Sequence, residues 1–372
     1  MAQILFVTWD GGGNVPPAIG IATELARRGH SITFLGHAQQ RKVLEKAGFS
    51  FEDYKAAKSW SSVEPIKGLS AALKVFGLFT DRGPGVDLLR LVRGQTIDLL
   101  VIDVMSLGAI EAAQRAGLRF VVLAHTFYRF LTHQWNRGPV GLVSRCQRMS
   151  LTKLWSSAEL FLVPTDRQLD PAKESDISAN VRYTGVVQAP PRLTEWEESG
   201  GEPVVLVSLS TLYVPGQDEA LQRILDALTG LPLKAIVTTG DAIDPKSLRV
   251  PANAEIHQRI PHEEILPKAR CVITHGGHST TMRALAHNLP LLIIPMHPMI
   301  DQQMVARSVV QHGAGITLRK TASAEEIKSA VKELVTDGQH RKAAAAIGSR
   351  LRSMNGAEKS ADEICALLDR TR

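Results

Sequence analysis

Two histidines, two glycines and several hydroxyl side chains stand together at residues 273–281, which read ITHGGHSTT. The apolar residues at 272–274 predict a buried strand, and residues 279–286 predict the start of a helix. N–H groups at a helix N-terminus attract anions, and glycine lets a ligand approach the backbone closely. Histidine and hydroxyl side chains donate hydrogen bonds to phosphate oxygens. The segment therefore favours a diphosphate site, with a serine-capped turn that binds no ligand as the alternative.

Other features of the composition argue against several other chemistries. Cys146, Cys271 and Cys365 are far apart and form no Cys-x-x-Cys pair, which argues against zinc and a disulfide framework and favours a reducing cytoplasm. No Asp-x-Asp occurs, so no metal is expected on the diphosphate, and no other cofactor is expected. No apolar run is long enough to cross a bilayer, and the N-terminus lacks the basic segment of a signal peptide. We therefore expect a cytoplasmic protein.

The formal net charge is +6. No stripe of Lys and Arg is interleaved with aromatic residues, so nucleic acid is not an expected partner. A basic balance also suits a small polyanion such as a nucleoside diphosphate, although most of these charges are typical of an ordinarily solvated surface.

Strands and helices alternate along the chain and supply the scaffold for such a site. In the first half, continuous apolar strands predict a parallel sheet covered on both faces. The expected strands there are 4–9, 32–35, 99–103, 120–124 and 160–164, with helices at 18–28, 38–47 and 107–116. The pattern restarts with strands at 204–208, 234–238, 255–258, 272–274, 291–295 and 316–318, followed by helical segments at 324–335 and 339–368.

The sequence thus predicts an α/β protein with two doubly wound, Rossmann-like parallel-sheet domains. We expect an N-terminal domain at 1–187, a linker rich in Pro, Gly and Glu at 188–203, and a second domain at 204–352. A C-terminal helix at 353–372 has the option of packing back on the first domain. Ligands bind beyond the carboxyl ends of such strands, so the cleft between the domains is the expected site.

The surroundings of the HGGHST segment carry a resemblance to a known family. The residues RIPH precede the segment at 259–262, the strand PLLIIP follows it at 290–295, and Asp301-Gln302 and Gly313-Ala314-Gly315 come next. Residues 259–318 resemble the nucleotide-sugar-binding segment of family 1 glycosyltransferases, the group that contains macrolide, glycopeptide and plant flavonoid glycosyltransferases. Segments 17–30 and 99–103 extend the resemblance to nearly the whole chain. It implies the GT-B fold, in which two Rossmann-like domains face each other across a cleft.

The resemblance implies a diphosphate site at the segment described first. The implied contacts are the ring of His275 and the backbone amides of Gly277, Ser279 and Thr280. Thr211, at the end of the loop SLST, is implied to touch the diphosphate from the opposite side, with a plain turn as the alternative. His278 occupies a position that varies in the family, where a ligand contact and an exposed turn residue are equally open.

Four further positions concern the sugar and the nucleoside. Asp301 and Gln302 are implied to bond hydroxyls of the donor sugar. Arg259 stands where the family often has a tryptophan on the base, and its guanidinium plane either stacks similarly or faces solvent. Arg283 stands where the family often has a carboxylate that bonds the ribose. That departure leaves dTDP sugars open beside UDP sugars; alternatively, Arg283 reaches a phosphate.

Inverting sugar transfer needs a base that takes the acceptor proton. Many family members use a histidine in the first loop, held by an aspartate at the end of a later strand. Here Asn14 stands at the histidine position and has no useful basicity, whereas Asp103 matches the aspartate. Three interpretations stay open: Asp103 as the base, directly or through water and oriented by Asn14; Asp10 or His125 as the base; or an acceptor that needs little activation. We favour Asp103.

The acceptor is expected on the N-terminal domain, where residues 59–84 and 126–155 have the least regular period. Aromatic residues at 126–155 predict an apolar pocket for the acceptor. In a second interpretation, the neighbouring arginines bind the domain to a membrane surface as a peripheral contact. A core helix with solvated arginines is a third interpretation. The aromatic residues concerned are Phe127, Tyr128, Phe130, Trp135 and Trp155.

The sequence therefore predicts a metal-independent inverting glycosyltransferase that moves a sugar from a UDP or dTDP sugar to a small hydrophobic natural product, at oxygen or carbon. We expect a monomer or a homodimer. The alternatives are a lipid-acceptor glycosyltransferase, a non-catalytic binding protein of the same fold, a nucleotide-sugar epimerase and an NAD-dependent oxidoreductase. The run Gly11-Gly12-Gly13 after the first strand suggests the NAD-dependent oxidoreductase. However, Pro16 stands where a dinucleotide-binding fingerprint needs its third glycine.

Overall fold

The computed structural model describes residues 1–61, 76–188, 202–210, 214–241, 243–336 and 338–370. Most of the expected linker at 188–203, together with Thr211, lies outside these residues. The described chain divides into two compact units. Unit 1 contains residues 1–61, 76–188 and 355–370, and unit 2 contains the described residues from 202 to 354.

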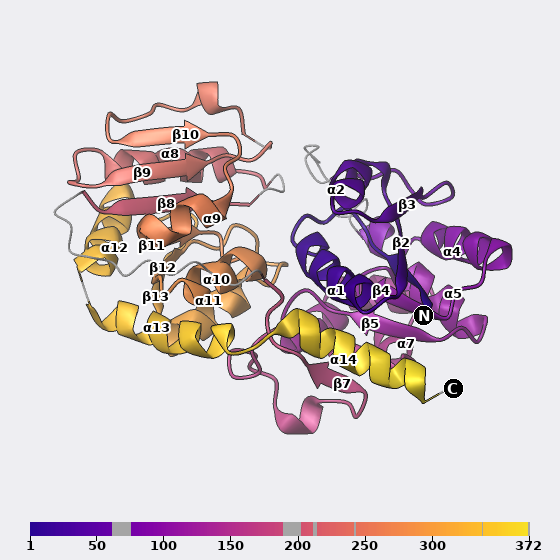
Figure 1. The fold of residues 1–372 in the computed structure, drawn as a ribbon. Helices are drawn as coiled ribbons and strands as arrows, with labels where there is room; N and C mark the ends of the chain where they lie inside the picture. Colours follow the sequence, from indigo (N-terminus) through magenta and orange to yellow (C-terminus); the bar gives the residue numbers. More distant parts are fainter. Residues whose placement is uncertain (62–75, 189–201, 211–213, 242, 337, 371–372) are drawn as a thin grey trace. The chain divides into compact units, whose positions relative to one another are not determined.

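Unit 1 is built on a parallel sheet whose seven described strands follow the order β3-β2-β1-β4-β5-β6-β7 (Figure 1). The strands are β1 (Gln3–Val7), β2 (Ser31–Gly36), β3 (Ser50–Asp53), β4 (Leu99–Asp103), β5 (Phe120–Leu123), β6 (Leu160–Val163) and β7 (Val181–Tyr183). The chain order reverses between the neighbours β1 and β4, which is the place where doubly wound sheets bind ligands.

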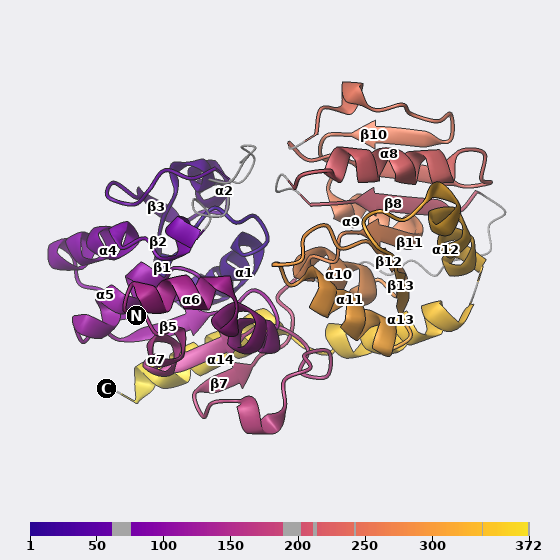
Figure 2. The same ribbon diagram turned by 180° about the vertical axis from the view of Figure 1, so that it is seen from behind.

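Helices cover both faces of this sheet. Helices α1 and α14 lie in front of it in Figure 1, and α5 and α6 lie in front of it in Figure 2. Buried Ile21 of α1 and Ile364 of α14 share one core cluster with Phe6 and Val101 of the central strands. The helices are α1 (Val15–Arg27), α2 (Arg41–Lys46), α4 (Gly83–Gly94), α5 (Leu107–Arg115), α6 (Pro139–Cys146), α7 (Leu151–Ser156) and α14 (Gly356–Asp369), with short turns η1 (Ala38–Gln40), η2 (Phe130–Trp135) and η3 (Glu174–Asp176).

The start of α1 bears on the candidate site. Pro16 and Pro17 occupy its first turn, where a missing N–H is tolerated and the proline φ suits a helix. Asn14 stands at the N-cap position, yet its side chain caps no helical N–H. The amide of Asn14 is therefore available for another partner.

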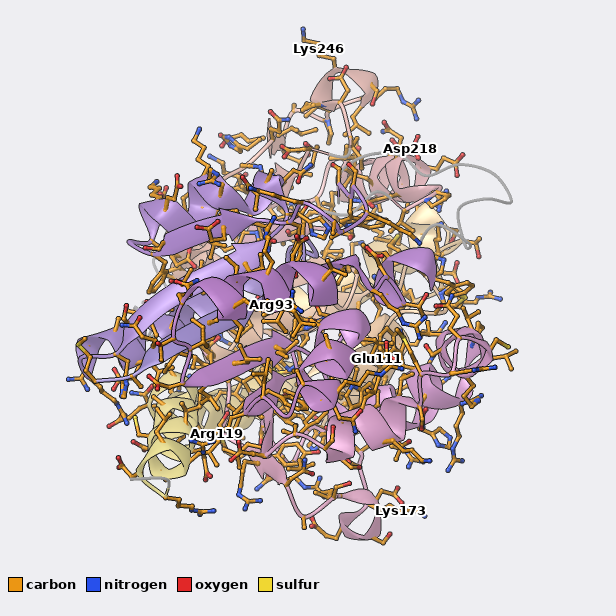
Figure 3. All side chains as sticks on the ribbon, turned by 90° about the vertical axis from the view of Figure 1, so that its right-hand side faces the viewer. Arg93, Glu111, Arg119, Lys173, Asp218 and Lys246 are labelled. Atoms are coloured by element: carbon orange, nitrogen blue, oxygen red, sulfur yellow. The ribbon has the colours of Figure 1, made fainter. Side chains whose placement is uncertain are left out.

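The C-terminal helix α14 packs in unit 1. Arg119, at the entrance to β5, donates from Nη2 to the carbonyl oxygen of Leu367 at 3.0 Å, and it lies beside α14 in Figure 3. A Cβ on Gly356 would lie 2.2 Å from the carbonyl oxygen of Gly185, so only glycine lets the helix start this close to the chain after β7.

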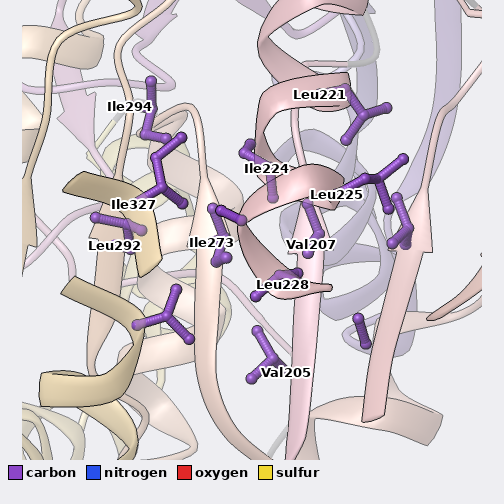
Figure 4. Packing of buried hydrophobic residues seen from close by; sticks show 14 of the residues in the cluster. Val205, Val207, Leu221, Ile224, Leu225, Leu228, Ile273, Leu292, Ile294 and Ile327 are labelled. Atoms are coloured by element: carbon purple, nitrogen blue, oxygen red, sulfur yellow. The ribbon is translucent and has the colours of Figure 1, made fainter. Parts of the chain in front are cut away.

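Unit 2 has a second parallel sheet, with six described strands in the order β10-β9-β8-β11-β12-β13. Figure 4 shows the buried core of this unit, in which Leu221, Ile224 and Leu228 of α8 meet Val207 of β8 and Ile273 of β11. The strands are β8 (Val204–Ser208), β9 (Lys234–Thr238), β10 (Ala254–His257), β11 (Ala269–Thr274), β12 (Leu291–Ile293) and β13 (Gly315–Thr317). The helices are α8 (Gln217–Leu228), α9 (His262–Ile265), α10 (His278–Ala286), α11 (Gln302–Gln311), α12 (Ala324–Thr336) and α13 (Gly338–Arg352), with short turns η4 (Pro245–Ser247) and η5 (Leu266–Lys268).

The predicted α/β class with two doubly wound parallel sheets is confirmed. The helical segment expected at 339–368 is interrupted at 353–355 between α13 and α14, next to the expected start of the C-terminal helix at 353. Strands β3 and β7 were not predicted. In the residues that the structure describes, no helix is long and apolar enough to cross a membrane.

Candidate functional site

In unit 1, three side chains follow the carboxyl ends of neighbouring strands. Trp9 comes two residues after β1, Asp103 ends β4, and His125 comes two residues after β5. Strands β1, β4 and β5 are adjacent and parallel, so their carboxyl ends lie along one edge of the sheet. Side chains that are far apart in sequence therefore meet at this edge.

Asp103 is the centre of this group. Its Oδ1 accepts hydrogen bonds from Trp9 Nε1 at 3.1 Å and from the Met105 backbone N–H at 2.9 Å. Its Oδ2 accepts one from Asn14 Nδ2 at 3.0 Å and lies 3.2 Å from His125 Nδ1. The carboxylate is only 6% exposed, and these donors offset the loss of water around its charge. Three of the four predicted catalytic candidates, Asp103, Asn14 and His125, are thus in contact.

Asn14 is buried, and the contacts of its amide define its role. Besides Asp103, Nδ2 lies 3.0 Å from the carbonyl oxygen of Trp9 and 3.2 Å from Thr8 Oγ1. The flipped amide would set its oxygen against these oxygen atoms, so the orientation follows from the network. Because an amide cannot take a proton at useful pH, Asn14 orients Asp103 and supplies no base.

Asp10, the fourth candidate, belongs to the loop that follows β1. Its backbone N–H donates to His37 Nδ1 at 3.3 Å, and its carbonyl oxygen accepts from Trp60 Nε1 at 2.8 Å. Burial lowers the pKa of His37, which keeps the ring neutral and leaves Nδ1 as an acceptor. The backbone of Asp10 thus helps to fix the conformation of this loop through His37 and Trp60.

Tyr54 supports the same loop from β3. Its hydroxyl donates to the carbonyl oxygen of Thr8 at 2.8 Å. Burial, with the charge of Asp103 as the second cause, raises the pKa of Tyr54 well above its ordinary value. The phenol therefore stays protonated and keeps this hydrogen bond through neutral pH.

Partly exposed aromatic rings stand beside Asp103. Trp9 packs against Phe79 with ring centroids 5.4 Å apart and against Trp60 at 6.3 Å. Because the Trp9 indole also bonds Asp103, these rings form an apolar surface next to the carboxylate. Trp60 and Phe79 lie within the segment 59–84 that was expected for the acceptor, whereas Trp9, at the end of an expected strand, was not singled out.

The aromatic residues expected to form an apolar pocket are instead core residues. Trp135 stacks on Trp155 at 6.2 Å, and Trp155 donates from Nε1 to the carbonyl oxygen of Val104. Their burial favours the interpretation of this region as core. The residues concerned, each at most 4% exposed, are Phe127, Tyr128, Phe130, Trp135 and Trp155.

In unit 2, the ITHGGHSTT segment joins β11 to α10 as expected. Gly276 has φ +87°, and a Cβ there would meet Ile293 Cγ2 at 2.7 Å, so glycine is needed for this turn. Gly277 is the N-cap residue of α10, with an extended backbone that any residue can adopt. A Cβ on Gly277 would nevertheless lie 2.5 Å from His275 Nε2, because the imidazole ring lies over this glycine.

His275 is therefore held at the N-terminus of α10. Burial lowers the pKa of His275 to about 4, against a hydrogen bond to the Ser208 backbone. The ring is neutral at neutral pH, and a diphosphate placed beside it would favour the protonated form, which has a donor on both nitrogens. His278, Ser279 and Thr280 form the first turn of α10 and are partly exposed.

Arg283 lies one helical turn after Ser279. Its Nη2 donates to Ser279 Oγ at 3.2 Å, and its Nη1 lies 3.1 Å from Glu263 Oε1 of α9. Arg283 thus places a positive charge beside the first turn of α10. Arg283 stands where the family often has a carboxylate, and Glu263 brings a carboxylate from α9 close to that position.

Arg259, which follows β10, is exposed, but its side chain is held by an ion pair with Asp241. Its guanidinium group makes two bonds to the carboxylate of Asp241, including Nε to Oδ1 at 3.1 Å. This pair lowers the pKa of Asp241. Since 67% of the arginine side chain is exposed, the pair holds a planar group in place with accessible surface.

Asp301 and Gln302 begin α11 and are both buried. Gln302 Oε1 accepts hydrogen bonds from the backbone N–H groups of Met296 at 2.7 Å and His297 at 3.1 Å. The carbonyl end of Gln302 therefore holds the loop after β12, and only its NH₂ end has capacity to bind a sugar hydroxyl.

Sequence reasoning gave no role to His262. Its Nε2 lies 3.2 Å from Ser208 Oγ, which also accepts from Thr238 Oγ1 at 3.0 Å. Burial lowers the pKa of His262 to about 4, and the charge of Arg283 acts in the same direction. This network links the ends of β8 and β9. Strand β8 is also the neighbour of β11, which leads into the His275 segment. His262 is the last residue of the RIPH segment at 259–262, but nothing in its spacing from other residues predicts a role for it.

Comparisons with known proteins agree with this arrangement. The family model described as UDP-glucoronosyl and UDP-glucosyl transferase matches residues 113–353. The chain is 26% identical to the NDP-glycosyltransferase YjiC of Bacillus licheniformis, over 96% of this chain and 95% of that protein. It is 24% identical to 4'-demethylrebeccamycin synthase of Lentzea aerocolonigenes, over 91% and 93% of the two chains.

Solved structures show the same fold. The calicheamicin glycosyltransferase CalG4 superposes with a TM-score of 0.80 at 25% identity, covering 100% of this chain and 99% of that one. The glycosyltransferase VinC, solved in complex with dTDP, superposes with a TM-score of 0.73 at 16% identity, covering 99% and 100%. The chain has the GT-B fold and belongs to the family of UDP-glucoronosyl and UDP-glucosyl transferases, and it is a glycosyltransferase.

Proposed function

We propose that this enzyme transfers a sugar from a UDP or dTDP sugar to a small hydrophobic natural product, with inversion at the anomeric carbon and without a metal ion. The names of its relatives support the donor and acceptor classes, since they include an NDP-glycosyltransferase and a 4'-demethylrebeccamycin synthase. The observation that carries the proposal is the partly buried His275 ring over Gly277 at the N-terminus of α10.

The leaving diphosphate gains negative charge as the glycosidic bond breaks. In this proposal, the N–H groups at the start of α10, a protonated His275 and the nearby Arg283 together meet that charge. These groups do the work that a divalent cation does in other transferases, which supports a metal-independent reaction. The Ser279 hydroxyl accepts from Arg283 and keeps its own proton for a phosphate oxygen.

The donor sugar and base are assigned to the flanking residues. Asp301 and the NH₂ end of Gln302 bond sugar hydroxyls, and Arg259 stacks on the base while Asp241 holds it. Thr211 keeps its proposed contact with the diphosphate, and His278 stays a candidate for the same ligand. The acceptor lies against Trp9, Trp60 and Phe79, next to Asp103.

Calorimetric titration with UDP, dTDP and GDP tests the donor site. We expect UDP or dTDP to bind more tightly than GDP. His275→Ala should weaken that binding by roughly ten- to a hundredfold, the worth of a hydrogen bond to a charged group. His312→Ala, at an exposed histidine elsewhere in unit 2, should leave the affinity unchanged. Equal binding of all three nucleotides, or none of any, would contradict the proposed donor class.

Turnover tests the reaction itself. Asp103→Asn should abolish transfer while leaving nucleotide affinity intact, because Asp103 belongs to unit 1 and the donor residues belong to unit 2. Full activity after removal of divalent cations with EDTA is expected. The coupling constant of the product's anomeric proton reports the configuration, and retention would exclude a single displacement.

A further inference from the structure

The Asp103 carboxylate already accepts three hydrogen bonds. A carboxylate offers roughly four lone-pair directions. Trp9 Nε1 and the Met105 N–H take two on Oδ1, and Asn14 Nδ2 takes one on Oδ2. His125 Nδ1 lies 3.2 Å from Oδ2, within ion-pair distance but without forming a hydrogen bond. Because the residue is only 6% exposed and its carboxylate is held by these donors, a substrate hydroxyl has little access to it, so Asp103 suits an orienting role better than that of a base.

His125 has the complementary arrangement. Its Nδ1 atom is buried 3.2 Å from Asp103 Oδ2 without forming a hydrogen bond, whereas 13% of the side chain is exposed through other atoms. A carboxylate next to Nδ1 draws the ring proton to that nitrogen and leaves the lone pair of the neutral imidazole on Nε2. If the ring gains a proton, the adjacent Asp103 charge stabilises the imidazolium.

We propose that His125 is the general base of the transfer and that Asp103, held by Asn14 and Trp9, is its positioning residue. This inference rests on the proposed function. The histidine that assists the acceptor thus comes from the end of β5, while the first loop contributes the amide of Asn14. The partly exposed rings of Trp9, Trp60 and Phe79 flank the same carboxylate and provide the surface for the acceptor.

The reaction balances as a single displacement. The acceptor oxygen forms its bond to the anomeric carbon while its proton passes to Nε2 of His125. The bond between the anomeric carbon and the diphosphate oxygen breaks, and its electron pair leaves with the nucleoside diphosphate. The imidazolium then returns its proton to solvent, and no oxidant, reductant or other reactant is consumed.

The tautomer of His125 tests the positioning without any substrate. The chain has 12 histidines, so the ¹⁵N signals of His125 are identified as those that vanish in His125→Gln. We expect neutral His125 to carry its proton on Nδ1 in the wild-type protein and to shift toward the Nε2–H form in Asp103→Ala. A wild-type ring with its proton on Nε2 would overturn the inference. The wild-type measurement stands even if the variant does not fold.

The second arm compares two acceptors with UDP-glucose or dTDP-glucose as donor. The hydroxyl of 4-methoxyphenol keeps its proton at neutral pH, whereas 4-nitrophenol is a much stronger acid and is about half ionised there. In His125→Gln, kcat with 4-methoxyphenol should fall by roughly 10²- to 10⁴-fold, the usual contribution of a general base. With 4-nitrophenol the fall should be far smaller, and His312→Gln should behave as wild type.

The two failures are distinguishable. Equal losses with both phenols, or no loss, would show that His125 takes no proton. A wild-type enzyme that glycosylates neither phenol counts against the proposed acceptor class, and the tautomer then decides the inference alone. Unchanged UDP or dTDP affinity in His125→Gln verifies that unit 2 is intact.

Discussion

The side-chain amide of Asn14 donates a hydrogen bond of 3.0 Å to Asp103 Oδ2 and thereby joins the loop after β1 to the end of β4. The same nitrogen lies within 3.2 Å of Thr8 Oγ1 and of the Trp9 carbonyl oxygen. One amide thus ties two main-chain segments to the carboxylate, which explains why it is not used to cap α1.

Removing that amide should affect both stability and rate. In Asn14→Ala, three buried acceptors lose a donor, so the free energy of unfolding should fall by on the order of 1–3 kcal/mol. The kcat should fall as well, because Asp103 loses a group that orients it. Urea denaturation and initial transfer rates measure the two effects, and calorimetry should find nucleotide affinity unchanged.

Asn180→Ala is the matched control. Asn180 is also in unit 1, and its Nδ2 donates to the carbonyl oxygens of Trp155 at 3.2 Å and Ala158 at 3.0 Å. We expect a similar loss of stability without a fall in kcat. An equal fall in kcat would mean that Asn14 acts only through the general rigidity of the unit.

Neighbouring glycines should give different phenotypes. Gly277→Ala is compatible with the backbone, but its Cβ would meet His275 Nε2 at 2.5 Å and move the ring. We expect wild-type stability and weaker nucleoside diphosphate binding. Gly276→Ala instead strains a backbone with φ +87° and collides with Ile293, so it should destabilise the protein. Thermal unfolding and calorimetry separate the two outcomes.

Gly338→Ala provides the comparison for these variants. A Cβ at Gly338 meets nothing within 4 Å, so neither affinity nor stability should decrease. If Gly277→Ala bound nucleotide as tightly as Gly338→Ala, the position of the His275 ring would be irrelevant to binding.

The central strands of both sheets were predictable because they are buried on both faces. Strands β4 and β8 carry uninterrupted apolar runs, and the expected ranges 99–103 and 204–208 coincide with them. Strands β3 and β7 are at the edges of the sheet in unit 1 and have four and three residues, with exposed or half-buried positions. Such short edge strands carry no apolar run that separates them from a loop.

The break in the C-terminal helix had a readable signal. The side-chain oxygen of Asn355 accepts from the backbone N–H of Glu358 at 3.2 Å, and its amide bonds the Glu358 carboxylate. An asparagine followed three residues later by a glutamate is a helix-start pattern, and it lies close to the expected start of the C-terminal helix at 353.

The two candidate sites also differ in how far the sequence alone could predict them. The ITHGGHSTT turn is local, so its chemistry follows from strand, glycine and helix positions in one short segment. The contact between Trp9 and Asp103 joins residues 94 positions apart and depends on β1 and β4 being neighbours. No spacing in a single sequence encodes that contact.

Acid should destabilise unit 2 through two partly buried histidines. The pKa values of His275 and His262 are lowered to about 4 from 6.5, first of all by burial. The unfolded chain therefore binds protons at a higher pH than the folded unit. The free energy of unfolding should fall as pH drops from about 6.5 and level off below about 4, by on the order of 1–3 kcal/mol per histidine.

Hydrogen exchange of β11 peptides at pH 7, 6 and 5 measures this loss within unit 2. Both His275→Gln and His262→Gln should flatten the pH dependence, each by part of the total. The exposed His312→Gln should not. An unchanged slope in both His275→Gln and His262→Gln would assign the acid sensitivity to other groups.

Pyrophosphate separates the roles of Arg259 and His275. If Arg259 stacks on the base while Asp241 holds it, Arg259→Ala should weaken UDP or dTDP binding by roughly three- to tenfold, the range of a cation–π contact. Its affinity for inorganic pyrophosphate should not change, whereas His275→Ala should weaken both ligands. Asp241→Ala keeps the guanidinium but releases it, so its effect on nucleotide binding should be intermediate. Equal weakening of pyrophosphate and nucleotide in Arg259→Ala would instead mean that its charge acts on the phosphates, and the exposed pair with Asp241 would then have no part in recognising the base.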